Sequence, residues 1–345
     1  MTRKNKMLNK TFQNLKDSTT AFYNRRLKTK DKRKTTAGKV GDLMGNLLKY
    51  FLLYGLAFII IYPILQQLSI ALRAPEDINK ALVVWIPEKF SLTNFKVAWI
   101  VLDYWTSLKN TVVLSVGVTL IQIFVTALAG YAFARLEFKG KNILFGFVIV
   151  IIVVAPTTIE IPLKQTMRNF LGLGINLSGS PAALYILTAL GLGIRSGIFI
   201  YLFRQFFRGV PVELEEAAYI DGASPIQVFL KIMLPNARGA ILLTAILTFV
   251  WQWNDNYYTL NFVSTNIDFQ TLTTKIMGVK GNIQGAIFQA GVYSLFDQDV
   301  TKNPLFTSMI LNTTAILSMI PLILFYMIVQ KALFKEGVER SGLVG

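Results

Sequence analysis

Six stretches of this sequence are apolar over about 20 residues, the length of helix that crosses the hydrocarbon core of a bilayer. They cover Leu47–Leu72, Thr111–Ala134, Ile143–Leu163, Ala182–Phe207, Ala240–Val263 and Leu305–Val329. Only 16% of the residues are charged, against about 25% in soluble domains. The sequence therefore predicts an all-α integral membrane protein with six transmembrane helices.

Positive charge is concentrated on one side of these predicted spans. Residues 1–40 hold thirteen Lys or Arg and only two acidic residues. Further basic residues lie near or after the ends of the second, fourth and sixth spans, within 135–141, 204–208 and 331–340. Because basic short loops and flanks stay in the cytoplasm, both termini are predicted to be cytoplasmic. A membrane-flanking tail is favoured over a nucleic-acid-binding one for the same reason.

These predictions divide the chain into five parts. They are a basic cytoplasmic tail at 1–46, a first transmembrane helix at 47–72, an extracytoplasmic loop at 73–106, a transmembrane domain at 107–335 and a cytoplasmic tail at 336–345. The transmembrane domain contains a cytoplasmic loop at 209–236 and an outer loop at 264–304. At about 40 residues, the outer loop is long for an idle connection.

The chain contains neither cysteine nor histidine. Thiol chemistry, zinc–thiolate sites and histidine-based acid–base catalysis are thus excluded. No Gly-x-x-x-x-Gly-Lys-Ser/Thr or Gly-x-Gly-x-x-Gly motif occurs, so no nucleotide site is predicted. We predict no catalytic residue, no metal site and no bound cofactor. Any work on a solute would draw energy from another chain or from a gradient.

The most clearly polar segment between the spans runs from Pro211 to Pro235 and is predicted to form two short helices. Pro211 suits the first turn of the first helix. Gly222 can end that helix in a left-handed conformation. Ser224 and Gln227 form the Ser-x-x-Gln pattern of a capping box, which starts the second helix. Three carboxylates would lie near the positive end of the first helix, where they are favoured: Glu213, Glu215 and Glu216.

Polar side chains inside the predicted spans are candidates for a solute pathway, because each is costly in hydrocarbon. Arg195 lies among three glycines and would either line a cavity in an interrupted helix or pack inside the bundle. Glu160 would either touch a polar solute or sit at the membrane interface. Trp253, Asn254 and Asp255 would either bind a sugar or form an aromatic belt with a helix break. The sequence leaves these alternatives open.

The polar segment resembles the EAA motif of bacterial ATP-binding-cassette (ABC) importer permeases. All seven motif positions match: Glu216, Ala217, Ala218, Gly222, Ile232, Leu234 and Pro235. Glu215, Asp221 and Ala223 belong to the same loop. The passages Gly130-Tyr-Ala-Phe-Ala-Arg135, Phe138-Lys-Gly-Lys141 and Trp253-Asn-Asp255 resemble the carbohydrate branch, and within it the shorter, MalG-like subunit.

This resemblance implies a type I ABC importer permease fold in a bacterial plasma membrane. It implies that the EAA loop docks into a cytoplasmic ATPase, which binds the ATP, and that the chain itself is not an enzyme. The implied partners are a second, MalF-like permease, two ATPase subunits, an extracytoplasmic solute-binding protein and a carbohydrate. An ABC permease for a non-sugar solute and a gradient-driven transporter are the alternatives.

Overall fold

The computed structural model describes residues 13, 16–18, 21, 30–77, 86–263, 268–293 and 304–340. Most of the predicted tail 1–46, parts of the loops 73–106 and 264–304, and the second half of the tail 336–345 lie outside these residues. The chain divides into two units, 1–66 and 67–345. The first unit contains most of α2, whose apolar part is exposed along its length.

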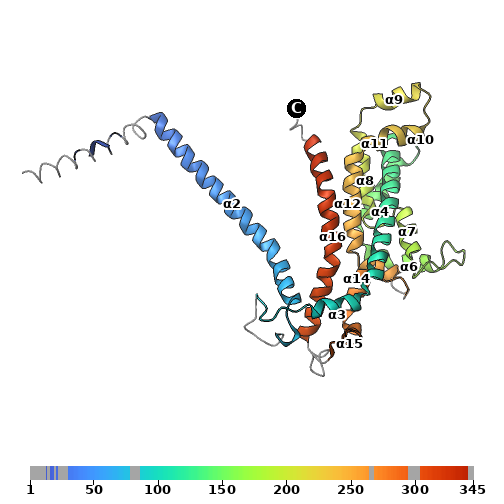
Figure 1. Ribbon diagram of the computed structural model, residues 1–345. Coiled ribbons are helices and arrows are strands. Elements are labelled where there is room, and N and C mark those ends of the chain that lie inside the picture. The colour runs from blue at the N-terminus through green and yellow to red at the C-terminus, as the bar shows by residue number, and fades with distance from the viewer. Residues whose placement is uncertain are drawn as a thin grey trace, which may run out of the picture. The chain divides into compact units, whose positions relative to one another are not determined.

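The described residues are all-α, as predicted, with two isolated β-bridges. The α-helices are α2 (Lys30–Ala71), α3 (Thr93–Leu102), α4 (Tyr104–Arg135), α5 (Lys141–Val153), α6 (Glu160–Arg168), α7 (Pro181–Ala189), α8 (Ser196–Arg208), α9 (Glu213–Ile220), α10 (Pro225–Val228), α11 (Leu234–Asn236), α12 (Arg238–Trp253), α13 (Tyr257–Phe262), α14 (Leu272–Met277), α15 (Val279–Gln289) and α16 (Pro304–Arg340). Short segments of other helix types are η1 (Pro75–Asp77), η2 (Pro156–Ile159) and the π-helix η3 (Phe229–Met233). In the second unit, α9 and α10 lie at one end, and α3 and α15 at the other (Figure 1).

Three of the six predicted spans are interrupted. The first, second and sixth runs lie within α2, α4 and α16, which are each long and apolar enough to cross a membrane. The third run bends by 107° between α5 and the η2–α6 segment. The fourth run is split between α7 and α8, and the fifth between α12 and α13. By length and composition the described residues hold three spanning helices, or up to five if each bent pair is one span.

Proline explains the bend in the third run. Pro156 has no N–H to donate and also disfavours helical geometry at the residue before it. Accordingly α5 ends at Val153, and Ala155 is extended, with φ −64° and ψ 135°. The chain then resumes in η2 in a new direction.

Helix α4 is the centre of the second unit, where it packs along α8, α12 and α7. Its close approach to α8 depends on Gly130. A Cβ at this position would lie 2.4 Å from Cβ of Phe203 and 2.9 Å from the backbone nitrogen of Arg204. Small residues at such crossings let membrane helices approach closely.

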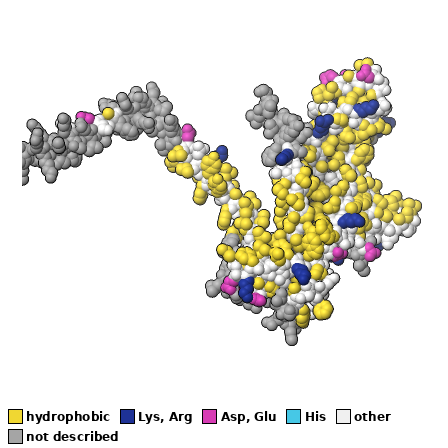
Figure 2. Space-filling view, viewed as in Figure 1, with side chains coloured by type: hydrophobic (Ala, Val, Ile, Leu, Met, Phe, Trp, Pro, Cys, Tyr) yellow, Lys and Arg dark blue, Asp and Glu magenta, His cyan; other side chains and the backbone are white. Residues whose placement is uncertain are grey.

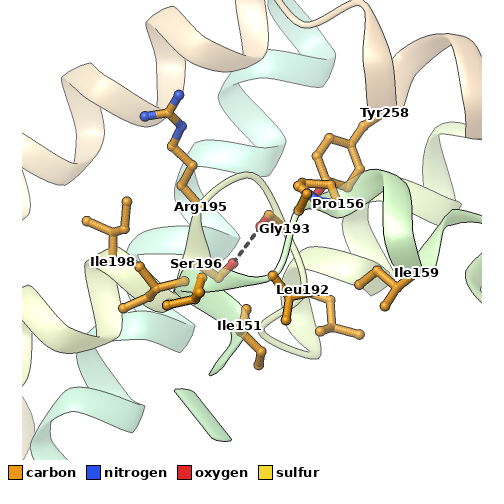
Figure 3. A pocket seen from close by; sticks show the side chains of 14 residues that line it. Ile151, Pro156, Ile159, Leu192, Gly193, Arg195, Ser196, Ile198 and Tyr258 are labelled. Carbon is orange, nitrogen blue, oxygen red and sulfur yellow. Dashed lines mark hydrogen bonds between the residues drawn. The ribbon is translucent and has the colours of Figure 1, made fainter. Parts of the chain in front are cut away.

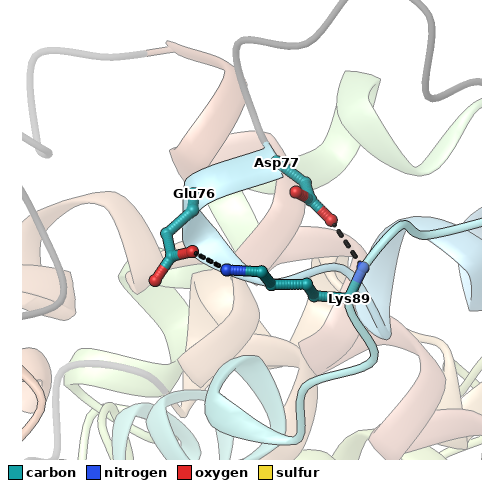
Figure 4. A network of polar contacts seen from close by, with 3 residues as sticks. All are labelled: Glu76, Asp77 and Lys89. Carbon is teal, nitrogen blue, oxygen red and sulfur yellow. Dashed lines mark hydrogen bonds and ion pairs between the residues drawn. The ribbon is translucent and has the colours of Figure 1, made fainter.

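The connection between α2 and α3 is stabilised by a small polar network (Figure 4). The buried carboxylate of Asp77 accepts a hydrogen bond from the backbone N–H of Lys89 at 3.0 Å. The Lys89 ammonium pairs with Glu76 at 2.8 Å. Asn94, at the start of α3, donates to the carbonyls of Ala71 and Arg73 at 2.9 and 2.7 Å. These bonds hold the start of α3 against the end of α2.

On the face shown in Figure 2, hydrophobic side chains cover the length of the second unit, and most of the charged side chains in view lie towards its ends. On α5, for example, the side chains of Phe147 and Val153 are 60% and 78% exposed. An apolar surface of this extent marks contact with lipid or with a partner protein.

We expect Gly130→Ala to lower the melting temperature of the purified protein in detergent. The added methyl group overpacks the α4–α8 contact, at a cost of about 1–3 kcal/mol. Gly146→Ala in α5 is the matched control, because nothing lies within 4 Å of its added Cβ. There the better helix propensity of alanine should maintain or raise the melting temperature. Equal behaviour of the two variants would contradict the close α4–α8 contact.

Candidate functional site

The connections that interrupt the third and fourth spans line one pocket of about 340 Å³ (Figure 3). One residue of the fifth span also lines it. The α5–η2 bend contributes residues 151–156 and 159, and the α7–α8 connection contributes 192, 193 and 195–198. Tyr258, which follows the break between α12 and α13, completes the lining. Broken helices that line a cavity are a recurring way to build a solute site inside a membrane protein.

The α7–α8 interruption is stabilised by a buried amide from α4. Gln122 is fully buried, and its Nε2 donates to Oγ of Ser196, the first residue of α8, at 3.0 Å. The Ser196 hydroxyl also lies 3.1 Å from the carbonyl of Gly193. A Cβ on Gly193 would lie 2.8 Å from Oε1 of Gln122, so only glycine fits here without a shift. The structure shows an interrupted helix at Arg195, which is one of the two alternatives that the sequence left open.

Arg195 itself has a left-handed backbone, with φ 53° and ψ 28°. This conformation costs a non-glycine residue roughly 1–2 kcal/mol. Its guanidinium lies 4.4 Å from the ring centroid of Trp251, a distance typical of cation–π contact. Among the described residues no carboxylate is paired with it. Arg195 therefore combines a costly backbone with an uncompensated charge at the pocket wall.

Glu160 lies just outside the pocket lining, next to Ile159. Its carboxylate pairs with Lys164 at 2.7 Å and accepts a hydrogen bond from the Tyr257 hydroxyl at 3.0 Å. These contacts tie α6 to the start of α13. A contact of Glu160 with solute stays a prediction.

The other three predicted pathway residues also lie outside the lining, and each makes a side-chain hydrogen bond within the protein. Trp253 is buried and donates from Nε1 to the carbonyl of Ser318 in α16 at 3.2 Å. Asn254 donates to the carbonyl of Val250 at 2.9 Å. Asp255, which precedes the N-cap residue Asn256, accepts hydrogen bonds from N–H of Tyr258 and of Thr259 in the first turn of α13. A role for these three in solute contact stays a prediction.

Sequence reasoning missed three residues that shape the pocket: Gln122, Ser196 and Tyr258. Arg195 was chosen as a candidate because it is a polar residue within an apolar run. Gln122 has the same property, so it could have been predicted from the sequence. The sequence contains no such signal for Tyr258, because only the tertiary fold places it beside the α5–η2 and α7–α8 connections.

At one end of the second unit, the helix pair 209–236 has the predicted local structure. Gly222 has φ +80°, and the Ser224–Gln227 capping box is present. The three predicted carboxylates lie in the first turn of α9. The prediction for Pro211 is wrong: α9 begins at Glu213, so this proline precedes the N-cap residue Val212.

One side of this helix pair is exposed and the other is buried. Glu216 is exposed, and the side chains of Ile220 and Ile226 are 87% and 71% exposed. Glu215 and Ala218 face the bundle. The second half of the motif, from Ile232 to Pro235, spans the end of η3 and the start of α11. The exposed apolar side chains form a surface suited to a protein partner.

A buried ion pair joins this loop to α4. Nε of Arg135, in the last turn of α4, lies 2.6 Å from Oε1 of Glu215; the Glu215 side chain is buried and that of Arg135 is 13% exposed. Nη2 of the same arginine donates to the carbonyl of Val210. The Tyr131 hydroxyl donates to Oε2 of Glu215 at 3.3 Å. A force on α9 would therefore reach α4 through direct bonds.

Comparisons with known proteins bear on both sites. The family described as "Binding-protein-dependent transport system inner membrane component" matches residues 51–336, which include the pocket and the helix pair. The chain is 32% identical to the alpha-glucoside transport system permease protein AglG of Rhizobium meliloti, over 58% of this chain and 52% of that protein. It is 30% identical to the arabinooligosaccharides transport system permease protein AraQ of Halalkalibacterium halodurans, over 61% and 73%. The alignment thus spans about half the length of AglG.

Two further comparisons concern solute and fold. The chain is 28% identical to the sn-glycerol-3-phosphate transport system permease protein UgpE of Escherichia coli, over 67% of this chain and 79% of that protein. A solved structure of a bacterial ABC transporter involved in the import of the acidic polysaccharide alginate superposes with a TM-score of 0.64. That match has 20% identity and covers 84% of this chain and 97% of the other. It shows a shared fold.

We expect Glu215→Gln to loosen α9, because it leaves the Arg135 charge buried without a counter-ion. Breaking a buried pair in this way costs about 3–5 kcal/mol. Hydrogen exchange of the α9 amides should accelerate, whereas Glu213→Gln, an exposed neighbour on the same helix, should leave exchange unchanged.

An apolar replacement of both partners provides the rescue test. The double variant Arg135→Met/Glu215→Leu removes both charges and should recover most of the lost protection. If Glu215→Gln leaves α9 exchange at the wild-type rate, the ion pair does not hold the helix.

Proposed function

We infer that this chain, which belongs to the family of binding-protein-dependent transport system inner membrane components, is the permease subunit of an ABC importer that moves a carbohydrate into the cytoplasm. The observation that carries this inference is the pocket at which the helix interruptions meet. Interrupting a transmembrane helix and holding an arginine in the left-handed conformation are both costly within a membrane. Binding of a polar solute at the interruption would account for this cost.

The pocket chemistry and the relatives support a carbohydrate solute. Arg195 supplies hydrogen-bond donors, and Tyr258 supplies a ring together with a hydroxyl. Such groups stack on sugar rings and bond to their hydroxyls. Two of the relatives are named for transport of alpha-glucosides and arabinooligosaccharides.

The helix pair 209–236 is proposed as the coupling site for a cytoplasmic ATPase. Its exposed face offers Glu216, Ile220 and Ile226 to a partner, and its buried face is bonded to α4 through Glu215. ATP would be bound by that partner and not by this chain. The complete importer would contain a second permease, two ATPase subunits and an extracytoplasmic solute-binding protein, in a bacterial plasma membrane. Six spans with cytoplasmic termini remain our proposed topology.

A second candidate solute is anionic and not a sugar. The Arg195 guanidinium has no carboxylate partner among the described residues, so it would attract a phosphate or carboxylate group. The relative UgpE is named for sn-glycerol-3-phosphate transport.

Arg195→Gly removes the side chain without disturbing the backbone, because glycine takes the same left-handed conformation without strain. We expect uptake into vesicles carrying the assembled importer to fall by tenfold or more, the order for losing a hydrogen bond to a charged group. The loss should be larger for glycerol phosphate than for an alpha-glucoside if the solute is anionic. Arg168→Gly, an equal loss of charge outside the lining, is the control. Unchanged uptake would remove this pocket from the pathway.

Gly222→Pro should abolish solute-stimulated ATPase activity of the assembled importer while the permease stays in the membrane. Proline fixes φ near −65°, whereas Gly222 has φ +80°, and its N–H donates to the carbonyl of Tyr219. Gly222→Asn should retain coupling, because asparagine tolerates the left-handed region. Normal stimulation in the proline variant would rule out the proposed coupling site.

A further inference from the structure

A second pocket, of about 520 Å³, lies between the α4–α5 connection and the last turns of α8. It is lined by Glu137, Phe138, residues 140–143, Arg204 and Arg208. The solute pocket shares none of these residues. This basic pocket lies on the side of the membrane that the charge distribution predicts to be cytoplasmic.

The basic pocket has an excess of positive charge. Three of its side chains are basic and one is acidic, and Lys141 pairs with the single acid, Glu137, at 3.0 Å. Arg204 and Arg208 lie one turn apart on the same face of α8. Neither has a carboxylate partner among the described residues. Two like charges held this close favour a bound anion.

The position of Arg204 is fixed by contacts that leave its charge uncompensated. Its Nε donates to the carbonyl of Phe133 at 3.3 Å, and its guanidinium lies 3.8 Å from the ring centroid of Phe145. The terminal nitrogens are not used in that hydrogen bond. An arginine oriented in this way can bind a phosphate group through two parallel hydrogen bonds.

Helix α5 adds a further attraction for an anion. It begins at Lys141, directly after Gly140, whose φ of 83° turns the chain into the helix. No side chain caps this end, and the lining residues Asn142 and Ile143 belong to the first turn. The positive end of the helix dipole therefore lies at the wall of the basic pocket.

An apolar stripe leads away from the basic pocket along α5. Ile143, which lines the pocket, is 70% exposed, and Phe147 and Val150 are exposed four and seven residues further on. Side chains at this spacing share one helix face. A free phosphate ion would make no contact with this apolar stripe, whereas the acyl chains of a lipid would pack against it.

We propose that the basic pocket binds the phosphodiester headgroup of an anionic phospholipid whose acyl chains run along the exposed face of α5. The two arginines and the start of α5 hold the phosphate, and the α5 stripe selects a lipid over a free anion. The bound lipid joins the α4–α5 connection to the end of α8.

The test measures lipids retained by the full chain after purification in detergent, by native mass spectrometry. The probes are dioleoylphosphatidylglycerol and, as the neutral match, dioleoylphosphatidylcholine. We expect selective retention of the anionic lipid and about a fivefold loss of its affinity for each arginine removed, in Arg208→Gln and in Arg204→Gln/Arg208→Gln. Lys139→Gln removes a charge from the same connection but not from the pocket lining, and should retain the lipid as the wild type does.

Each other outcome overturns the proposal. Equal retention of both lipids, or unchanged retention in Arg208→Gln, shows that the arginines do not bind a headgroup. Displacement of the lipid by millimolar inorganic phosphate identifies a free-anion site. Loss of ATPase subunits from the purified importer in Arg208→Gln, with lipid retention unchanged, identifies a protein contact. Because Arg208 is exposed, this single variant tests the proposal even if the double variant fails to fold.

Discussion

Inside hydrocarbon, every backbone N–H and C=O must find a partner within the protein, and this requirement governs where the helices of this chain can break. Each break exposes groups that a continuous helix would satisfy. At the α7–α8 connection, the N–H groups of Gly191 and Leu192 donate hydrogen bonds to the carbonyls of Thr188 and Leu187, at 3.0 and 2.8 Å. At the start of α13, the Asp255 carboxylate accepts the freed N–H groups. At both of these breaks the freed N–H groups therefore find their acceptors within the protein.

The pocket at the helix interruptions and the helix pair 209–236 are joined by continuous packing. Helix α8 starts at the pocket with Ser196 and ends at Arg208, about 20 Å away at 1.5 Å per residue. It lies against α4 at the Gly130 contact, and α4 in turn pairs with the loop through Arg135. The two helices thus provide a physical route by which movement of the loop would change the pocket wall.

Local features were predictable from sequence, and long-range ones were not. The capping box, the left-handed Gly222 and the apolar runs depend on neighbouring residues, so their patterns are visible in the chain. The 107° bend at Pro156 was missed because apolar length alone suggested one straight span. Asp255 was predicted to be available to a solute, yet it accepts a hydrogen bond from the first turn of α13. The hydrogen-bond partner of Trp253 lies 65 residues away in sequence. Such partners are set by the tertiary fold.

The hydrogen bond between Gln122 and Ser196 also has a consequence for biosynthesis. Its two partners are 74 residues apart in sequence. At about 5–20 residues per second, Ser196 leaves the ribosome roughly 4–15 s after Gln122. Three threonines of α4, Thr111, Thr119 and Thr126, bond to carbonyls of their own helix and need no such partner. For those seconds the Gln122 amide is a polar group that the insertion machinery must shield from lipid, until α8 arrives to cover it.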